Sequence, residues 1–364
     1  MILCANPSAQ FKSYQSEIET AVLAVMRGDR YVLGEEVTKL EQEFASYIGT
    51  KEAIGVANGT DALELALRAL NIEAGDEVIT VSHTAVATVA AIEAAGATPV
   101  LIDVEPYYYT LNPLQLDEVL TSKTKAVIVV HLYGQSADMD AITNFCNKHD
   151  LSLIEDTSQA HGAKYKSKRL GSIGDIGCFS CYPTKNLGAI GDAGLITTNS
   201  IELATKIRMA REYGWKNRIS EFAGRNSRLD EMQAAILRIK LKYLDLDNEK
   251  RRQIAQYYMT HLSGAHVSLP VIRTDNESVF HLFVIQVERR KELLSYLLSK
   301  DIRAGIHYPV PVHLQPAYKD RVLVASDMSV TESLTDRIIS LPMYPEISIN
   351  DIGIVADVIK ELYL

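Results

Sequence analysis

Short apolar runs alternate with helix-like stretches through the first half of the chain, and this alternation strongly constrains the fold. Strand-like runs are expected at Glu52–Val56, Glu77–Val81, Thr98–Ile102, Ala126–Leu132 and Leu151–Glu155. Helical periodicity lies between them, at Asp61–Leu70, Val86–Ala95, Leu114–Leu120 and Met139–His149. Such alternation is typical of a mostly parallel sheet covered on both faces. The sequence therefore predicts an α/β fold, with a further strand pair at Ile176–Ser180 and Gly194–Thr198.

The C-terminal third has a different pattern, which predicts a second and smaller unit. Helices are expected at Ser227–Leu244, 250–262, Glu292–Lys300, Ser329–Ser340 and Ile352–Leu362, and a strand at Phe280–Val287. A chain of 364 residues is also longer than one ordinary core requires. We therefore predict a large domain over residues 1–245 and a smaller α+β domain over residues 246–364.

Charge and apolar patterning narrow the classes of function. The net charge of −9 argues against nucleic acid as the main partner, because phosphate binding needs a basic face. The N-terminus lacks a basic segment followed by an apolar core, so no signal peptide is expected. The apolar stretch 85–102 is interrupted by Glu93, Gly96 and Pro99, which does not fit a membrane span. These features predict a cytoplasmic protein.

The four cysteines are Cys4, Cys146, Cys178 and Cys181, and their spacing is not that of a disulfide framework. Cys178 and Cys181 form a C-x-x-C, but no second pair or histidine cluster accompanies it. A zinc site is therefore not expected, and reduced thiols are the better interpretation.

Lys185 lies in a loop of small residues, YPTKNLGAIGDAG, with Gly188, Gly191 and Gly194 following it. A solvent-exposed lysine needs no such surroundings, whereas a lysine that contacts a flat, buried group does. We interpret Lys185 as the residue that forms a Schiff base with pyridoxal 5′-phosphate (PLP).

The rest of a PLP site can be assigned along the chain. Asp156 follows a predicted strand, at the sheet edge where α/β proteins bind ligands, and its carboxylate could face the pyridine nitrogen. Gly59 and Thr60 precede a predicted helix whose N-terminus favours a phosphate. Ser180 could add a hydroxyl to that phosphate, and Gln159 could bond the ring oxygen. Taken alone, Asp156 and the helix start are equally compatible with ordinary caps.

Five ordered motifs carry a resemblance to a known family: ANGTDALELALRAL, GDEVI, IEDTSQAHGA, YPTKNLGAIGDAG and NSRLDEMQAAIL. Together they resemble the DegT–StrS family of PLP-dependent nucleotide-sugar aminotransferases. The resemblance implies the aspartate aminotransferase type I fold and a homodimer with shared active sites. It implies Lys185 as the Schiff-base lysine, Asp156 as the pyridinium partner, and Gln159 at the ring. It also implies Asn226 as a phosphate ligand from the second subunit.

The sequence departs from the family pattern after GDEVI, where an aromatic residue often stacks on the cofactor. Ala85 occupies that place here, within VSHTAVAT. His83 is a candidate substitute, and a purely structural role for His83 is equally compatible with the sequence.

Three further features are most similar to the sugar 3-aminotransferases of the QdtB, FdtB and TylB type: the run SHTAVATVAAIEAAGATP, the pair Tyr182-Pro183, and the runs YGWKNR and NSRLDE. This resemblance implies a dTDP-3-keto-6-deoxyhexose as substrate and L-glutamate as the amino donor, without deciding the epimer. Candidate substrate contacts are Tyr31, Tyr182, Arg218, His307, Tyr308 and His313. For each of them, packing between the two domains is the alternative interpretation.

Other functions would use the same fold or parts of the same predicted site. A 4-aminotransferase acting on a dTDP- or UDP-linked 4-keto sugar would use the same cofactor site. Related sugar dehydratases carry histidine in place of the lysine, so Lys185 argues against that reaction. A non-catalytic regulator would not need Lys185, Asp156 and Gly59-Thr60. A nicotinamide-dependent dehydrogenase is disfavoured because no G-x-G-x-x-G follows the first strand.

Overall fold

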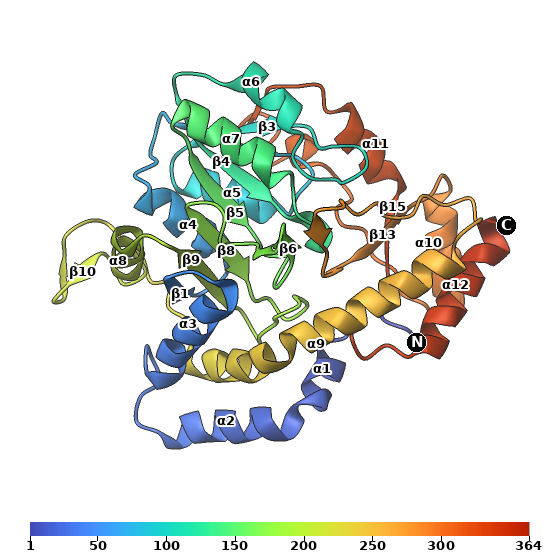
Figure 1. The fold of residues 1–364 in the computed structure, drawn as a ribbon, viewed down its shortest axis with the longest axis horizontal. Coiled ribbons are helices and arrows are strands. Elements are labelled where there is room, and N and C mark those ends of the chain that lie inside the picture. Colours follow the sequence, from blue (N-terminus) through green and yellow to red (C-terminus); the bar gives the residue numbers. More distant parts are fainter. Residues whose placement is uncertain (364) are drawn as a thin grey trace.

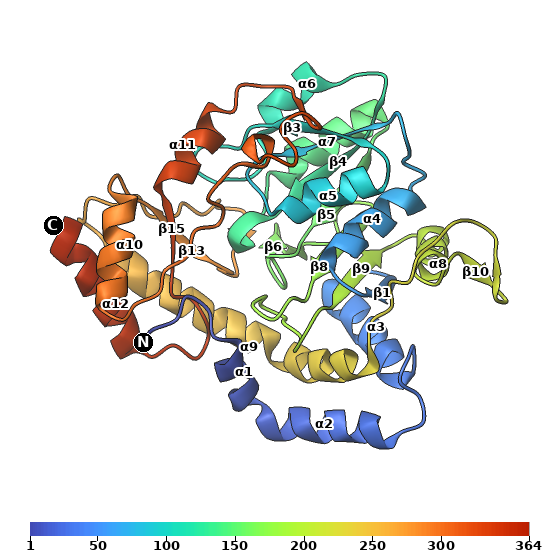
Figure 2. The same cartoon turned by 180° about the vertical axis from the view of Figure 1, so that it is seen from behind.

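The computed structural model describes residues 1–363. Its centre is an eight-stranded sheet, which Figure 1 and Figure 2 show from opposite sides. The spatial order is β1 (Glu52–Val56), β9 (Gly194–Thr198), β8 (Ile176–Ser180), β5 (Ser152–Asp156), β4 (Thr124–Val130), β2 (Glu77–Val81), β3 (Thr98–Ile102) and β14 (Leu323–Val324). Strand β9 pairs antiparallel with both of its neighbours, and the other pairings are parallel. The predicted mixed, mostly parallel sheet is therefore confirmed.

Helices cover both faces of this sheet. One face packs on α4 (Gly59–Ala69), α5 (Val86–Ala94) and α8 (Ile201–Ala210), which share a buried apolar cluster with the strands. The other face packs on α3 (Glu35–Ile48), α6 (Leu116–Val119), α7 (Met139–His149) and the first turns of α9 (Glu231–His261). Helix α7 lies in front of the sheet in Figure 1, and α4 and α5 lie in front in Figure 2.

The C-terminal part forms a separate apolar cluster around a two-stranded sheet. Its elements are β13 (Phe283–Gln286), β15 (Ile338–Leu341), α10 (Arg290–Ser299) and α12 (Ile349–Tyr363). The N-terminal residues pack here too, since Ile2 pairs with Ile302. Helix α11 (Ser329–Arg337) instead packs Leu334 into the apolar cluster of the large sheet. The division after residue 245 stays a prediction, and it falls inside a continuous helix.

That helix, α9 (Glu231–His261), corrects the expectation of two helices over this region. No glycine or proline interrupts residues 245–249, so the helix continues. Two buried polar residues in its middle are hydrogen-bonded to other elements: Asp247 accepts from the Tyr14 hydroxyl at 2.8 Å, and Asn248 accepts from the Asn186 amide at 2.8 Å. In Figure 1, α9 runs from beneath the large sheet to the C-terminal part.

A second correction concerns the helix expected at Ser329–Ser340. The helix ends at Arg337, and the next four residues form β15, which pairs antiparallel with β13. These residues are all buried, and two of them are β-branched isoleucines that favour a strand. The edge of β13 thereby gains a hydrogen-bonded partner.

The remaining elements are short or lie at the edges. The N-terminal helices are α1 (Pro7–Ser13) and α2 (Gln15–Arg27), and α2 runs along α9. Short strands are β6 (Lys164–Tyr165), β7 (Lys168–Arg169), β10 (Trp215–Lys216), β11 (Ile219–Ser220) and β12 (Asn276–Glu277). The 3₁₀ turns are Pro113–Gln115, Leu132–Gly134 and Val312–Leu314. Among residues 1–363, no helix is both long and apolar enough to cross a membrane.

Candidate functional site

One cavity of about 490 Å³ gathers most of the predicted site residues. It lies where β5 and β8 end and where α4 and α5 begin. This is the carboxyl edge of the parallel strands, the usual ligand position in open α/β sheets. Its lining includes Asn58, Gly59, Thr60, Asp61, Thr84, Ala85, Asp156, Ser158, Gln159, Ser180, Tyr182, Lys185 and Asp192.

Lys185 reaches the cavity from the loop between β8 and β9. The loop is fixed by its own backbone: the Lys185 N–H donates to the Tyr182 carbonyl, and the Ala189 N–H donates to the Cys181 carbonyl, both at 2.8 Å. Burial lowers the pKa of Lys185 from 10.5 to about 8, and the nearby Asp156 carboxylate partly opposes this shift. Part of the Lys185 population is therefore the neutral amine near neutral pH, which is the form that attacks a carbonyl.

Asp156 ends β5, and both of its carboxylate oxygens are held. The Ser158 N–H donates to Oδ1 at 3.2 Å, and the buried Thr88 hydroxyl donates to Oδ2 at 2.9 Å. Two fixed donors restrict the rotation of the carboxylate. Thr88 had no signal of its own in the sequence, because its partner lies far away in the chain.

The N-terminal turn of α4 forms a cradle against Ser180. Asn58 caps the helix by accepting from the Asp61 N–H at 2.8 Å. A Cβ built at Gly59 would lie 2.5 Å from Ser180 Cβ, so only glycine allows the two backbones to approach this closely. The N-terminus of α4 with its dipole, and the residues Thr60 and Ser180 with their hydroxyls, all line the same cavity, which suits a phosphate.

Gln159 is fixed by hydrogen bonds at both ends of its amide. The Tyr133 N–H donates to Oε1 at 2.9 Å, and Nε2 donates to the Tyr308 hydroxyl at 3.0 Å. Burial, reinforced by Asp156, raises the pKa of Tyr308 to about 12, so its hydroxyl stays protonated. Tyr308 therefore joins the C-terminal part of the chain to the cavity wall through Gln159.

His307 and His313 lie at the boundary between the two parts, outside the cavity lining. The His307 ring is hydrogen-bonded to the Ser340 hydroxyl at 2.8 Å, and its carbonyl accepts from the Tyr133 hydroxyl. The His313 ring is held by the Ser82 hydroxyl at 2.7 Å and by Glu332 at 3.1 Å. The His307 ring is thus held within the C-terminal part, whereas the His313 ring joins that part to Ser82 after β2. The substrate contacts of both residues stay predictions.

His83 does not replace the missing aromatic residue at the cavity. Its ring is 1% exposed, is hydrogen-bonded to the Tyr133 hydroxyl at 2.8 Å, and meets Tyr133 and Tyr109 edge to face. Burial lowers the pKa of His83 to about 4, so the ring is neutral. Ala85 does line the cavity, at the start of α5. The structural role of His83 is the one that the geometry favours.

Tyr182 lines the cavity mouth and is 52% exposed. Tyr31, Arg218 and Asn226 are also exposed, but the cavity of this chain does not include them. Arg218 lies in the β10–β11 hairpin, which projects away from the sheet in Figure 1. The roles of these three residues stay predictions.

The segment around Asn226 is anchored beside the cradle by its neighbours. Arg225 forms ion pairs with Asp61, at 3.2 Å, and with Glu64. The Ser227 hydroxyl accepts from the Ala57 N–H at 3.1 Å. Asn226 itself remains exposed between these two anchors.

Sequence reasoning missed Asp192 as well as Thr88. Asp192 is exposed at the cavity mouth, near the end of the lysine loop. Its position could have been inferred only from the fold of that loop, because nothing distinguishes it from other loop carboxylates.

Cys178 and Cys181 are buried free thiols, and burial raises the pKa of both, to about 12 for Cys181.

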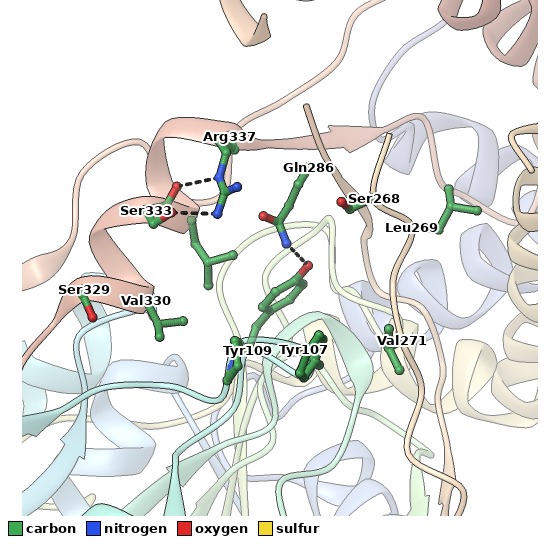
Figure 3. Close-up of a pocket in the computed structure, with 12 residues that line it drawn as sticks. Tyr107, Tyr109, Ser268, Leu269, Val271, Gln286, Ser329, Val330, Ser333 and Arg337 are labelled. Carbon is green, nitrogen blue, oxygen red and sulfur yellow. Dashed lines mark hydrogen bonds between the residues drawn. The ribbon is translucent and has the colours of Figure 1, made fainter. Parts of the chain in front are cut away.

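A second hollow of about 490 Å³ lies between α11, β13 and the loop after β3 (Figure 3). Its main polar groups bond one another. The Gln286 amide donates to the Tyr109 hydroxyl at 2.7 Å, and Arg337 donates to the Ser333 hydroxyl at 2.7 Å. None of the predicted site residues lines it, so it is not the site assigned from the sequence.

The residues around the first cavity fit PLP. Gly59, Thr60 and Ser180 line the cavity at the N-terminus of α4, where backbone N–H groups and two hydroxyls suit an anion. An amine and an oriented carboxylate lie on the same cavity, as the aldehyde and the ring nitrogen of PLP require. This donor set matches the cofactor group by group.

Known proteins resemble this chain over nearly its whole length. A model described as the DegT/DnrJ/EryC1/StrS aminotransferase family matches residues 12–360. The chain is 47% identical over 348 residues to the dTDP-3-amino-3,6-dideoxy-alpha-D-galactopyranose transaminase of Aneurinibacillus thermoaerophilus, covering 95% of each protein. It is 43% identical over 355 residues to the dTDP-3-amino-3,4,6-trideoxy-alpha-D-glucose transaminase of Streptomyces venezuelae, covering 97% of this chain and 94% of that protein.

Solved structures share the fold. DesV of S. venezuelae in complex with a ketimine intermediate has a TM-score of 0.96 and 42% identity, covering 100% of this chain and 98% of that one. NtdA from Bacillus subtilis with bound cofactor PMP has a TM-score of 0.87 and 30% identity, covering 96% of this chain and 82% of that one. The architecture described above is therefore that of solved aminotransferase relatives.

Proposed function

The chain belongs to the DegT/DnrJ/EryC1/StrS aminotransferase family, and from this premise we propose that it transfers an amino group from L-glutamate to C3 of a dTDP-3-keto-6-deoxyhexose. The product is then a dTDP-3-amino-3,6-dideoxyhexose. Two relatives support C3, because both of their names place the amino group there on a dTDP-linked deoxy sugar. Neither of them favours the alternative of a 4-amino sugar.

The proposed cofactor is PLP, which when bound supplies an electron sink for charge that develops at the reacting carbon. Lys185 holds it covalently, and Asp156 keeps a proton at the ring nitrogen. Gly59, Thr60 and Ser180 bind the phosphate, and Gln159 bonds the ring oxygen. The single observation that supports this assignment most is the convergence of Lys185, Asp156 and the α4 cradle on one cavity.

Lys185 also moves the protons of the reaction. Its Nζ takes the proton from Cα of glutamate in the first half of the cycle and delivers a proton to C3 of the sugar in the second half. A pKa of about 8 suits both roles, because the amine then gains and loses a proton with little cost near neutral pH. One cavity serves both substrates in turn, which predicts ping-pong kinetics.

We further propose a homodimer with shared sites. The charged groups in the cavity lining are three carboxylates, Asp61, Asp156 and Asp192, and one amine, Lys185. Glutamate and the nucleotide diphosphate are anions, and beyond the phosphate cradle this lining offers them Lys185 as its one cationic side chain. Asn226 and Arg218 lie on exposed segments, from which they could complete the cavity of a second subunit.

A panel of nucleotide-linked keto sugars tests the proposed reaction. Purified enzyme with PLP and glutamate is expected to aminate dTDP-3-keto-6-deoxyglucose or -galactose, and mass spectrometry with NMR would locate the amine at C3. The matched control is the dTDP-4-keto-6-deoxy sugar, which differs only in the position of the carbonyl. Preferred turnover of that control would contradict C3 specificity, and a colourless protein that binds no PLP would contradict the enzyme assignment altogether.

Tyr182 offers a test of which residues contact the sugar. Tyr182 lines the cavity and is exposed, so Tyr182→Phe should lower kcat/KM for the keto sugar about tenfold through one lost hydrogen bond. The glutamate half-reaction, followed alone by the absorbance change of the cofactor, should stay within about twofold. An equal loss in both half-reactions would show that Tyr182 acts on the cofactor and not on the sugar.

A substitution of Gly59 tests whether the N-terminus of α4 binds the phosphate of PLP. Gly59→Ala should raise the Kd for PLP at least about tenfold, because overpacking of about 1–3 kcal/mol must displace either the helix turn or Ser180. Adding Ser180→Gly removes the side chain that the new methyl would strike. We therefore expect Gly59→Ala to weaken binding much less in the Ser180→Gly background than in the wild type. Unchanged PLP binding by the single variant would contradict the assignment.

A further inference from the structure

Two buried hydroxyls lie behind the proposed pyridinium partner. Thr88 is 0% exposed and Thr84 is 2% exposed. The Thr88 hydroxyl donates to Asp156 Oδ2 at 2.9 Å, and the two threonine hydroxyls are 3.1 Å apart. A hydroxyl has a single proton, and Thr88 gives its own to Asp156. The Thr84 hydroxyl must therefore donate to Thr88, so the pair forms a chain that ends on the carboxylate.

This arrangement is not what a helical threonine does by default. Threonine in a helix commonly bonds the backbone carbonyl one turn earlier. Thr88 instead crosses from α5, which follows β2, to the end of β5, although β4 lies between these strands in the sheet. The contact joins residues 68 positions apart in the chain, so it reflects the tertiary fold and not a local motif.

Resting on the proposed function, we infer that Thr88, aligned by Thr84, is a positioning residue of the reaction that holds the Asp156 carboxylate in one orientation. Hydrogen bonds to a charged group are directional and among the stronger ones. Without the bond from Thr88, the carboxylate would be free to turn away from the ring nitrogen, and the ring would hold its proton less firmly. Three other titratable groups interact electrostatically with Asp156: Lys185, Tyr308 and Cys178. A substitution of Thr88 or Thr84 leaves all three unchanged.

The test compares Thr88→Val with Thr88→Ser. Valine keeps the shape and removes the hydroxyl, whereas serine keeps the hydroxyl. We expect Thr88→Val to lower kcat about tenfold with both substrates, because hydrogen bonds to charged groups are among the stronger ones. Thr88→Ser should recover most of that loss. Thr84→Val should have a smaller effect, since the bond from Thr88 to Asp156 remains.

Two readouts separate positioning from mere folding. With isotope-labelled PLP, the NMR shift of the ring nitrogen should move toward the unprotonated value in Thr88→Val and return in Thr88→Ser. The thermal midpoint of the cofactor-free protein should be similar in the two variants. A wild-type nitrogen shift in Thr88→Val, or no recovery by serine, would overturn the inference. Failure of the wild type itself to bind PLP would instead overturn the proposed function.

Discussion

Lys185→Ala is expected to abolish transamination and the visible absorbance of the bound cofactor. The cavity lining holds no other amine that could form the Schiff base with PLP and then move the proton at the reacting carbon. The expected loss in kcat is on the order of a thousandfold or more. Product formation from glutamate and the keto sugar is measured by mass spectrometry, and the cofactor by its absorbance near roughly 400 nm.

Lys185→Arg is the matched control for charge. Arginine keeps a cation in the cavity but is not deprotonated in proteins, so it provides neither a nucleophile nor a base. Both variants should therefore be inactive, while both should still bind PMP through the cradle of Gly59, Thr60 and Ser180. Substantial turnover by either variant would contradict the role of Lys185. Loss of PMP binding would show that the lysine loop had been disturbed as a whole.

The strands of the large sheet could be predicted from the sequence because their signals are local. A buried parallel strand is a short, continuous apolar run, and β2 and β3 begin and end where these runs do. The ends of α9 and α11 were harder, because tertiary contacts decided them. Asp247 and Asn248 resemble a polar break between helices, yet buried partners make them part of one helix.

The same distinction applies to the site. Gly59 begins α4, Asp156 ends β5 and Lys185 lies in the loop after β8, so the order of elements along the chain suffices to bring them to one sheet edge. Thr88 and Asp192 carry no such signal, because their relation to the site depends on how α5 and the lysine loop pack. His83 shows the reverse case: its sequence position suggests a cofactor contact, but the ring turns toward Tyr133.

Asp156→Asn should separate the charge at this position from its shape. The amide oxygen can still accept from the Thr88 hydroxyl or from the Ser158 N–H, so the side chain stays nearly in place. What is lost is the negative charge that keeps a proton on the ring nitrogen. We expect kcat to fall by about 10²–10³, comparable to the loss of one preorganised electrostatic contact, while the visible absorbance of the lysine-bound cofactor remains.

An N-methylated PLP provides the decisive control for Asp156. Its ring nitrogen carries a permanent positive charge, so it does not need a carboxylate to stay cationic. Reconstitution with this cofactor should raise the kcat of Asp156→Asn relative to the same variant with PLP, and it should not rescue Lys185→Ala, whose missing amine it cannot replace. Asp156→Glu, which keeps the charge on a longer side chain, should lose less than Asp156→Asn. An Asp156→Asn enzyme with wild-type kcat would show that the carboxylate faces something other than the ring nitrogen, and the roles inferred for Thr88 and Thr84 would fall with it.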